Sequence, residues 1–360
     1  MNSYRITGAK DSNGKASNYF ISDGKFVNEG ELASGAKDID AKGLTLLPGF
    51  VDLHTHLREP GREDAETVLT ASMAAASGGF TAISAMPNTL PVADTAGVVE
   101  QVYRLGKHHG VCDVFPIGAV TVGQSGAQLA ELAAMNQSEA GVRIFSDDGH
   151  CVFDPLVMRR ALEYVKIFDG LIAQHAQDPR LTQDSQMNEG EISARLGLKG
   201  WPAVAEEAII ARDVLLAEHV DSRLHICHVT TAGGVEIIRS AKKRGIKVTA
   251  EVTPHHLLLT DDLAESYDPV YKVNPPLRTK DDVQALREGL ADGTIDIIAT
   301  DHAPHPHESK DCEWSAAAFG MVGLETAFSI AYQAMVETKL ITLTQLVDRL
   351  SKNPADIGRY

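Results

Sequence analysis

Apolar and polar positions follow a repeating strand-then-helix pattern along most of this chain. From about residue 46, an apolar run of strand length is followed by a stretch with the helical period, and this pair recurs. Eight strands are expected, at residues 46–54, 81–86, 113–120, 142–146, 171–175, 223–229, 247–252 and 295–300. Amphipathic helices are expected between most of them, at residues 65–77, 94–108, 154–168, 203–219, 233–244 and 279–290. Strands that alternate with helices eight times predict a parallel (β/α)8 barrel of the TIM type, in the α/β class.

The pattern changes at both ends of the chain. Residues 1–49 hold short strand-like pieces, Tyr19–Ile21 and Leu44–Leu47, between turns rich in Gly, Asn, Asp and Ser. We therefore expect a small β domain over residues 1–49, appended to a barrel over residues 50–345. Residues 346–360 are expected to form a helical end that leads toward the β domain.

Two later segments carry further expectations. The connection from His256 to Leu277 is irregular and contains an expected extended piece at Tyr271–Asn274. After residue 323 the pattern is helical through about Leu350.

The composition supports a folded α/β protein and limits the kinds of partner that it can bind. The chain has 360 residues, of which 44% are apolar, and this is enough for a large core. A net charge of -16 argues against nucleic acid and against an anionic membrane as general partners. An anionic substrate would therefore have to be attracted by a few local cations.

The four cysteines and the absence of a targeting segment indicate in which part of the cell the protein is located. The cysteines form no C-x-x-C pair, which is typical of reduced thiols in the cytoplasm. Residues 1–10 hold no apolar core of a signal peptide, and no run of 18 apolar residues occurs. We therefore expect a cytoplasmic protein that crosses no membrane. Cys227 is expected to point to the opposite face of its strand from His228, and so not to bind a metal.

The first expected strand ends in a pair of histidines. Side chains of a strand alternate between its faces, so His54 and His56 share one face while Thr55 points away. Two adjacent imidazoles at a strand end can bind one metal ion. Taken alone, the pair is as well explained by two exposed or hydrogen-bonded histidines.

Other expected strands also end in polar residues that can bind a metal or a substrate. These residues are Asn88, Asp147, Asp148, His175, His228 and Asp301. Each has an ordinary explanation, such as a hydrogen-bonded core histidine or an aspartate at a helix N-cap. In a barrel, however, the carboxyl ends of the strands meet at one face, so the set favours a metal site.

Imidazole and carboxylate ligands suit Zn²⁺, and Mn²⁺, Co²⁺ and Fe²⁺ fit the same donors. Four histidines and two aspartates can hold two ions that share one carboxylate, as in two-metal hydrolases. Such a pair lowers the pKa of a bound water to give hydroxide near neutral pH, and it polarises a carbonyl. A carboxylate nearby can carry the proton from the water to a leaving nitrogen. This chemistry is hydrolysis of an amide-like C–N bond, or its reversal.

Further polar residues are candidates for substrate binding. The planar guanidinium of Arg58, two residues after His56, fits a carboxylate. Asn88 and Asn274 could bond a carboxylate or a ureide, although turn chemistry explains them equally well. His305, four residues after Asp301, could contact an anion. The polar segment Pro304–Trp314 is expected to be either a mobile lid or an ordinary surface loop.

Several segments together resemble the amidohydrolase superfamily and, within it, the type I bacterial dihydroorotases. The resemblance covers about residues 44–355 and is carried by Pro48–Gly61, Met86–Thr89, Val273–Arg278, Ala299–His305 and Gly323–Ala327. It implies reversible conversion of N-carbamoyl-L-aspartate to L-dihydroorotate in pyrimidine synthesis, with Zn²⁺ as cofactor, one or two ions per subunit and two expected.

The resemblance also implies roles for individual residues. His54, His56 and Asp301 would bind one metal, and His175 and His228 the other. Related enzymes often bridge the ions with a carboxylated lysine, whereas type I enzymes use an aspartate. Asp148 is the expected bridge, and Asp147 is the alternative. Asp301 would also be the acid and base in catalysis. Arg58, Asn88 and His305 would hold the substrate carboxylate, and Asn274 with the backbone near Gly320 would hold the ring.

Alternatives to this function stay open at the level of sequence. A hydantoinase or allantoinase would use the same metal chemistry, but it would not need the carboxylate-binding residues. An inactive dihydroorotase-like partner of aspartate transcarbamoylase would lack metal ligands, and none is missing here. A homodimer and association with that transcarbamoylase are candidates for an active enzyme. Relatives usually continue beyond the Asn353–Ala355 segment, so we expect the β domain to be incomplete.

Overall fold

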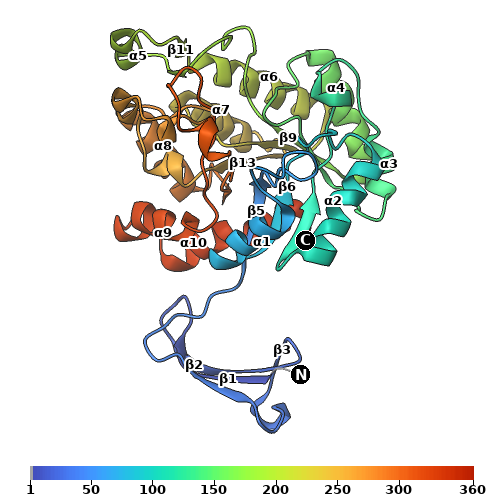
Figure 1. The fold of residues 1–360 in the computed structure, drawn as a ribbon, viewed down its shortest axis with the longest axis vertical. Coiled ribbons are helices and arrows are strands. Elements are labelled where there is room, and N and C mark those ends of the chain that lie inside the picture. The colour runs from blue at the N-terminus through green and yellow to red at the C-terminus, as the bar shows by residue number, and fades with distance from the viewer. Residues whose placement is uncertain (1–2) are drawn as a thin grey trace.

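Eight parallel strands form the centre of the main body. The computed structural model describes residues 3–360 (Figure 1). One sheet has the order β5-β6-β7, with β5 (Phe50–Thr55), β6 (Phe80–Ala85) and β7 (Asp113–Pro116). The other has the order β14-β13-β12-β9-β8, with β8 (Ile144–Phe145), β9 (Leu171–Gln174), β12 (Leu224–Ile226), β13 (Val248–Val252) and β14 (Ile297–Ile298). All eight overlap expected strands, and the α/β class is confirmed.

Several strands are shorter than expected at their carboxyl ends. β12 stops before His228, whose φ is 27°, and β14 stops before Asp301, whose φ is 47°. These positive φ values turn the backbone of His228 and Asp301 out of the extended conformation. The residues that were expected at strand ends therefore lie on short turns that follow the strands.

Isolated parallel bridges connect the two sheets along both margins. Gly118 pairs with Phe145, and its N–H donates to the carbonyl of Ile144 at 3.1 Å. A Cβ at Gly118 would lie 2.8 Å from Met135 Sδ and 3.0 Å from the Phe145 ring, so a larger residue would require these side chains to shift. On the other margin Thr55 pairs with His302, and the His56 N–H donates to the His302 carbonyl at 2.8 Å.

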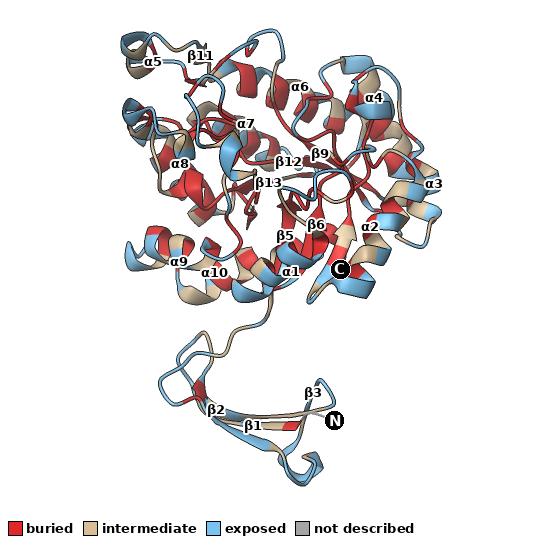
Figure 2. Ribbon diagram, viewed as in Figure 1, coloured by how far each residue is buried: buried red, intermediate tan, exposed pale blue. Residues whose placement is uncertain are grey.

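Helices cover the outer side of the strands and bury one face each (Figure 2). They are α1 (Val68–Ser77), α2 (Ala96–His109), α3 (Leu132–Gln137), α4 (Pro155–Val165), α6 (Val204–Val220), α7 (Ala232–Lys243) and α8 (Lys280–Asp292). All six expected helices are present. The short helix α3 was not expected, and neither was the insertion with β10 (Met187–Asn188), α5 (Glu191–Leu196) and β11 (Gly200–Trp201). Among residues 3–360, no helix has both the length and the apolar character needed to span a bilayer.

Two expectations about later segments were wrong. The expected extended piece at Tyr271–Asn274 is not a strand, because Asp268 caps a 3-10 helix at Pro269–Tyr271. The helical run after residue 323 is interrupted. It consists of α9 (Ala327–Ala331), a π-helix (Tyr332–Glu337) and α10 (Leu343–Leu350), with Lys339 at a φ of 62° between the last two.

The last helix, α11 (Lys352–Gly358), packs across the amino ends of the central strands. Ala355 and Ile357 contact an apolar cluster that includes Leu53. The ring of Tyr360 stacks on Phe115 at a centroid distance of 3.9 Å. This end of the strands is therefore covered by apolar contacts. The predicted boundary at residue 345 falls inside α10, and the three domain ranges stay a prediction.

A four-stranded sheet lies apart from the main body in Figure 1. Its order is β3-β2-β1-β4, with β1 (Ser3–Lys10), β2 (Ala16–Ser22), β3 (Lys25–Val27) and β4 (Lys37–Asp40). Tyr19–Ile21 lies in β2, whereas Leu44–Leu47 contributes only a bridge from Thr45 to Lys10. The turn between β1 and β2 contacts α10, where the Thr344 hydroxyl donates to Asn13 Oδ1 at 3.1 Å.

Candidate active site

Four histidines and two aspartates meet at the carboxyl ends of the central strands. His54 is the next-to-last residue of β5 and His56 follows the strand, Asp148 follows β8, and the others follow β9, β12 and β14. The six residues are His54, His56, Asp148, His175, His228 and Asp301, and each is at most 5% exposed. Residues up to 247 positions apart in the sequence (54 to 301) thus form one buried cluster, as the strand-end pattern predicted.

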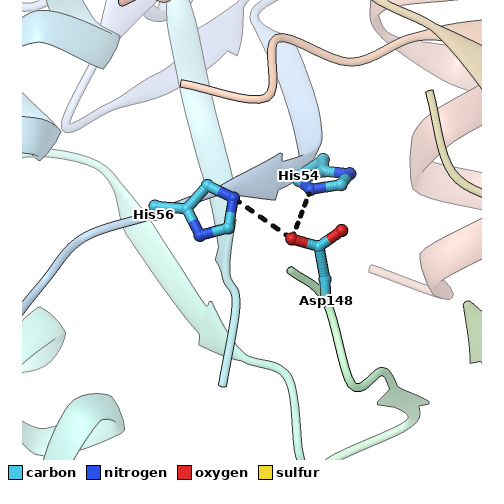
Figure 3. Close-up of side chains that lie close together, drawn as sticks. All are labelled: His54, His56 and Asp148. Atoms are coloured by element: carbon cyan, nitrogen blue, oxygen red, sulfur yellow. Dashed lines mark ion pairs between the residues drawn. The ribbon is translucent and has the colours of Figure 1, made fainter. Parts of the chain in front are cut away.

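Asp148 lies between two pairs of histidines. Its Oδ1 is 3.1 Å from His175 Nδ1 and 3.1 Å from His228 Nε2. Its Oδ2 is 3.3 Å from His56 Nε2 and 3.4 Å from His54 Nε2, and both rings point toward it in Figure 3. Asp148 forms one trio with His54 and His56 and a second trio with His175 and His228. Within each trio, one donor atom of every residue lies within 4.8 Å of the others. The two groups of possible metal ligands therefore share this carboxylate.

Asp147 faces away from the cluster. Its Oδ1 accepts the N–H groups of Val120 at 2.8 Å and Thr121 at 3.0 Å, and its Oδ2 accepts the Thr121 hydroxyl at 2.5 Å. Asp147 thus fixes the loop after β7, and its neighbour Asp148 is the aspartate that faces the histidines.

Asp301 completes the cluster on the side of β5. Its Oδ1 is 3.0 Å from His56 Nε2 and 3.5 Å from His54 Nε2. A carboxylate oxygen of Asp301 also lies within 4.8 Å of a ring nitrogen of His228. Asp301 therefore borders both pairs of histidines.

Hydrogen bonds at Nδ1 orient both histidines of the first pair, His54 and His56. Glu251 Oε1 accepts from His54 Nδ1 at 2.5 Å, and Asn88 Oδ1 accepts from His56 Nδ1 at 2.9 Å. These acceptors orient the rings so that both Nε2 atoms face Asp148 and Asp301, and His56 Nε2 is within hydrogen-bond distance of Asp301 Oδ1 at 3.0 Å. Within residues 3–360, His54 Nε2 is buried and has no hydrogen-bond partner.

The electrostatics of the cluster fit a bound cation. Burial disfavours the imidazolium of His54, but the carboxylates of Asp148, Glu251 and Asp301 raise its pKa well above the usual value. The buried acids thus favour positive charge at this point, and buried charges require a compensating partner. Because imidazole nitrogens and carboxylate oxygens are typical donors to divalent metals, the residues present fit a metal site.

Glu251 forms hydrogen bonds to residues of the cluster, and its role was not predicted from the sequence. Besides His54, its Oε1 accepts the backbone N–H of His228 at 3.2 Å, and its Oε2 accepts from His225 Nε2 at 3.0 Å. It therefore connects one histidine from each half of the cluster. A signal was present, because a glutamate in the apolar strand Val248–Val252 must be buried and needs partners.

Asp52 is a second buried acid that the sequence argument missed. Its Oδ1 accepts the N–H of His54 at 3.0 Å and the N–H of Thr300 at 3.1 Å. It thereby fixes β5 against the turn that carries Asp301.

The expectation that Cys227 points away from the metal-binding residues was wrong. Its Sγ lies within 4.8 Å of a ring nitrogen of His54 and a carboxylate oxygen of Glu251. β12 ends at Ile226 and the backbone of His228 has positive φ, so the alternation of a strand does not extend to this pair. Burial raises the pKa of the Cys227 thiol to above its ordinary value, so it is held as the neutral thiol.

A pocket of about 200 Å³ opens beside the cluster, and it is lined by all five residues predicted to bind substrate. These are Arg58, Asn88, Asn274, His305 and Gly320, and the pocket also includes Asp148, His175 and Asp301. The structure therefore places the predicted substrate-binding residues and the metal-binding residues around one space.

The polar atoms of this pocket are arranged to receive a ligand. Arg58 is buried, its Nε donates to the Pro304 carbonyl at 3.0 Å, and one terminal nitrogen lies 3.5 Å from His305 Nε2. Burial, and then the charge of Arg62, lower the pKa of Arg58 to about 10, so its guanidinium stays charged at neutral pH. In the described part of the chain, Asn274 Oδ1 and His305 Nδ1 are buried without a hydrogen-bond partner.

We predict that Glu251→Gln weakens metal binding by about 10- to 100-fold, because the amide cannot accept from His54, His225 and the His228 backbone with a full negative charge. Metal affinity measured by competition with a chromogenic chelator checks this. The matched control is Glu236→Gln, which changes an exposed glutamate of α7 and should bind metal like the wild type. Equal affinity in both variants would contradict a supporting role for Glu251.

Comparison with known proteins agrees with this arrangement. A family model described as dihydro-orotase-like matches residues 43–233. The chain is 67% identical over 362 residues to the dihydroorotase of Streptomyces coelicolor, spanning 100% of this chain and 84% of that protein. It is 65% identical to the dihydroorotase of Leifsonia xyli subsp. xyli, spanning 98% and 81%. The solved L-hydantoinase (dihydropyrimidinase) from Arthrobacter aurescens matches with a TM-score of 0.87 at 26% identity, over 100% of this chain and 83% of that one. The chain belongs to the dihydroorotase family.

Proposed function

We propose that this protein is a metal-dependent cyclic amidohydrolase that interconverts N-carbamoyl-L-aspartate and L-dihydroorotate, a step of pyrimidine biosynthesis. The observation that carries this proposal is a single pocket in which Arg58, Asn88 and His305 lie beside the buried His and Asp cluster. The cationic and amide groups suit the carboxylate of these molecules, and the cluster suits hydrolysis of a ring amide.

The metal ligands are proposed to be His54, His56, Asp148, His175, His228 and Asp301. Two Zn²⁺ ions that share Asp148 would use both groups of donors, and Mn²⁺, Co²⁺ or Fe²⁺ suit the same atoms. When bound there, a divalent metal supplies a Lewis acid that polarises a carbonyl and lowers the pKa of water.

The remaining steps are assigned to side chains of the chain itself. Asp301 takes the proton of the attacking water and delivers it to the ring nitrogen that leaves, and in ring closure it acts in reverse. Its position is fixed because Asp52 binds the preceding residue, Thr300. Arg58, Asn88 and His305 hold the substrate carboxylate, while Asn274 and the backbone of Gly320 hold the ring.

The fold assigned to this function is one closed barrel. We infer that the three-stranded and five-stranded sheets form a single (β/α)8 cylinder, supported by the bridges Gly118–Phe145 and Thr55–His302 on the two margins. The appended β domain, a cytoplasmic location, a homodimer and association with aspartate transcarbamoylase stay predictions from the sequence.

The function is tested by stripping the protein with a chelator, reloading it with Zn²⁺ and adding dihydroorotate. We expect ring opening, seen as a loss of ultraviolet absorbance, in the reloaded protein and not in the stripped protein. No turnover at neutral or mildly alkaline pH would contradict the proposal. Because the L-hydantoinase shares the fold, dihydrouracil is the matched control substrate, and equal turnover of it would favour a hydantoinase-like activity.

Asp301→Asn should lower kcat by at least roughly 10²-fold, because an amide cannot accept the proton, while an amide oxygen can still occupy the ligand position. Metal content should stay at the wild-type value. The control is Asp311→Asn, an exposed aspartate on the same loop. Near-normal turnover by Asp301→Asn would refute the proton-transfer role.

Arg58→Ala should raise the KM for dihydroorotate by about 10- to 100-fold, with a smaller change in kcat, because it removes a charged pair of donors from the pocket. Steady-state kinetics on metal-loaded protein measure both constants. Arg62→Ala removes an exposed charge nearby and serves as the control. An unchanged KM in Arg58→Ala would show that the guanidinium does not contact the substrate.

A further inference from the structure

The substrate pocket and a second hollow share part of their lining. The second hollow has a volume of about 290 Å³ and is lined mainly by apolar side chains, including Val270, Met321 and Val322. Ala303, His305 and Gly320 line both spaces, and we call these three residues the partition. His305 is also proposed to bind the substrate carboxylate, so the apolar hollow lies behind the carboxylate-binding end of the pocket.

The partition is closed by contacts at His305 and Gly320. His305 Nε2 donates to the carbonyl of Phe319 at 2.7 Å. Gly320 has a φ of 150°, and a Cβ there would lie 2.7 Å from His305 Nε2. Only glycine therefore lets this backbone approach the imidazole so closely.

Lys310 holds the backbone of the partition from the side of the hollow. Its Nζ donates to the carbonyls of Lys272 at 3.0 Å, Ala318 at 2.9 Å and Gly320 at 3.0 Å. An ammonium group has three donors, and all three are used here. The N–H of Gly320 donates to the same Lys272 carbonyl at 3.0 Å, so Lys310 and Gly320 converge on one acceptor.

Further hydrogen bonds join the segment 304–320 to its surroundings. Lys272 Nζ donates to the Trp314 carbonyl at 2.7 Å and lies 4.4 Å from the centroid of the Phe319 ring. The N–H of Ala318 donates to the Ser309 carbonyl at 3.0 Å. The segment expected to be either a mobile lid or a surface loop, Pro304–Trp314, is thus bonded to the backbone that borders the pocket.

We propose that Lys310 is a positioning residue that determines substrate specificity, because it holds Ala318–Gly320 against His305 and so keeps the apolar hollow closed to the substrate. This inference rests on the proposed function. A group placed where the carboxylate binds would have to displace the partition to enter the hollow. With the partition held, a carboxylate meets the guanidinium of Arg58, whereas an apolar group in its place finds no space.

The test compares Lys310→Met with the wild type and with Lys243→Met, which removes an exposed lysine of α7. Two properties are measured on protein of equal metal content. The first is hydrogen exchange of the backbone amides of residues 314–320. The second is the kcat and KM for dihydroorotate and for 6-phenyl-5,6-dihydrouracil, which carries a phenyl group in place of the carboxylate.

We expect faster exchange at Ala318 and Gly320 in Lys310→Met, because three carbonyls lose a charged donor. The KM for dihydroorotate should rise about tenfold with kcat changed less than about threefold, since the residue acts through position and not chemistry. The ratio of kcat/KM for dihydroorotate over the phenyl analogue should fall by at least about tenfold. Lys243→Met should match the wild type in all measurements.

Unchanged exchange together with an unchanged substrate ratio in Lys310→Met would overturn the inference. If that variant does not fold, Lys310→Gln, which keeps a shorter neutral donor, carries the same comparison with the same two outcomes. Inactivity of the wild type toward dihydroorotate would refute the proposed function, whereas the exchange measurement does not depend on turnover and tests the role of Lys310 separately.

Discussion

The buried carboxylate of Asp148 is the interaction on which the rest of the site depends. It lies within 3.4 Å of a ring nitrogen of each of four histidines, and it is almost inaccessible to solvent. An acid in this position is costly to bury unless positive charge is close to it. With Glu251 and Asp301 nearby, three buried acids surround the imidazoles, and this concentration of negative charge suits a divalent cation.

The backbone around this cluster departs from ideal strand geometry where the chemistry is concentrated. Arg58, His228 and Asp301 all have positive φ, at 64°, 27° and 47°. Such conformations cost energy for residues other than glycine and persist only when their surroundings hold them. Two buried acids supply that support. Glu251 binds the N–H of His228, and Asp52 binds the N–H that precedes Asp301. The supporting acids and the proposed ligands therefore form one unit.

The sequence was sufficient to predict which strand ends converge, because the carboxyl ends of parallel strands must meet at one face. The strand-end pattern predicted that His54, His175 and Asp301 lie in one cluster, and the structure brings them together. It was insufficient where the chain leaves the strand. Side-chain alternation failed at Cys227, because β12 stops one residue earlier. The residues alone did not separate Asp147 from Asp148, since both follow the same strand and only the loop after β7 captures one of them.

Glu251 was missed for a different reason. Polar residues that follow a strand stand out in the sequence, whereas Glu251 lies inside the apolar strand β13. Helix α3 and the insertion around α5 were missed because each is only six residues long, too short for a helical period to be recognised.

A single hydrogen bond links the metal-binding half of the site to the substrate-binding half. Asn88 Oδ1 accepts from His56 Nδ1 at 2.9 Å. This bond turns the other ring nitrogen of His56 toward Asp148 and Asp301, and it fixes the orientation of the Asn88 amide. The same contact therefore sets the orientation of a proposed metal ligand and the direction of a proposed carboxylate donor. Substrate placement and metal placement are coupled through one side chain, so the distance between the bound carboxylate and the reacting amide is set by the protein and not by the substrate alone.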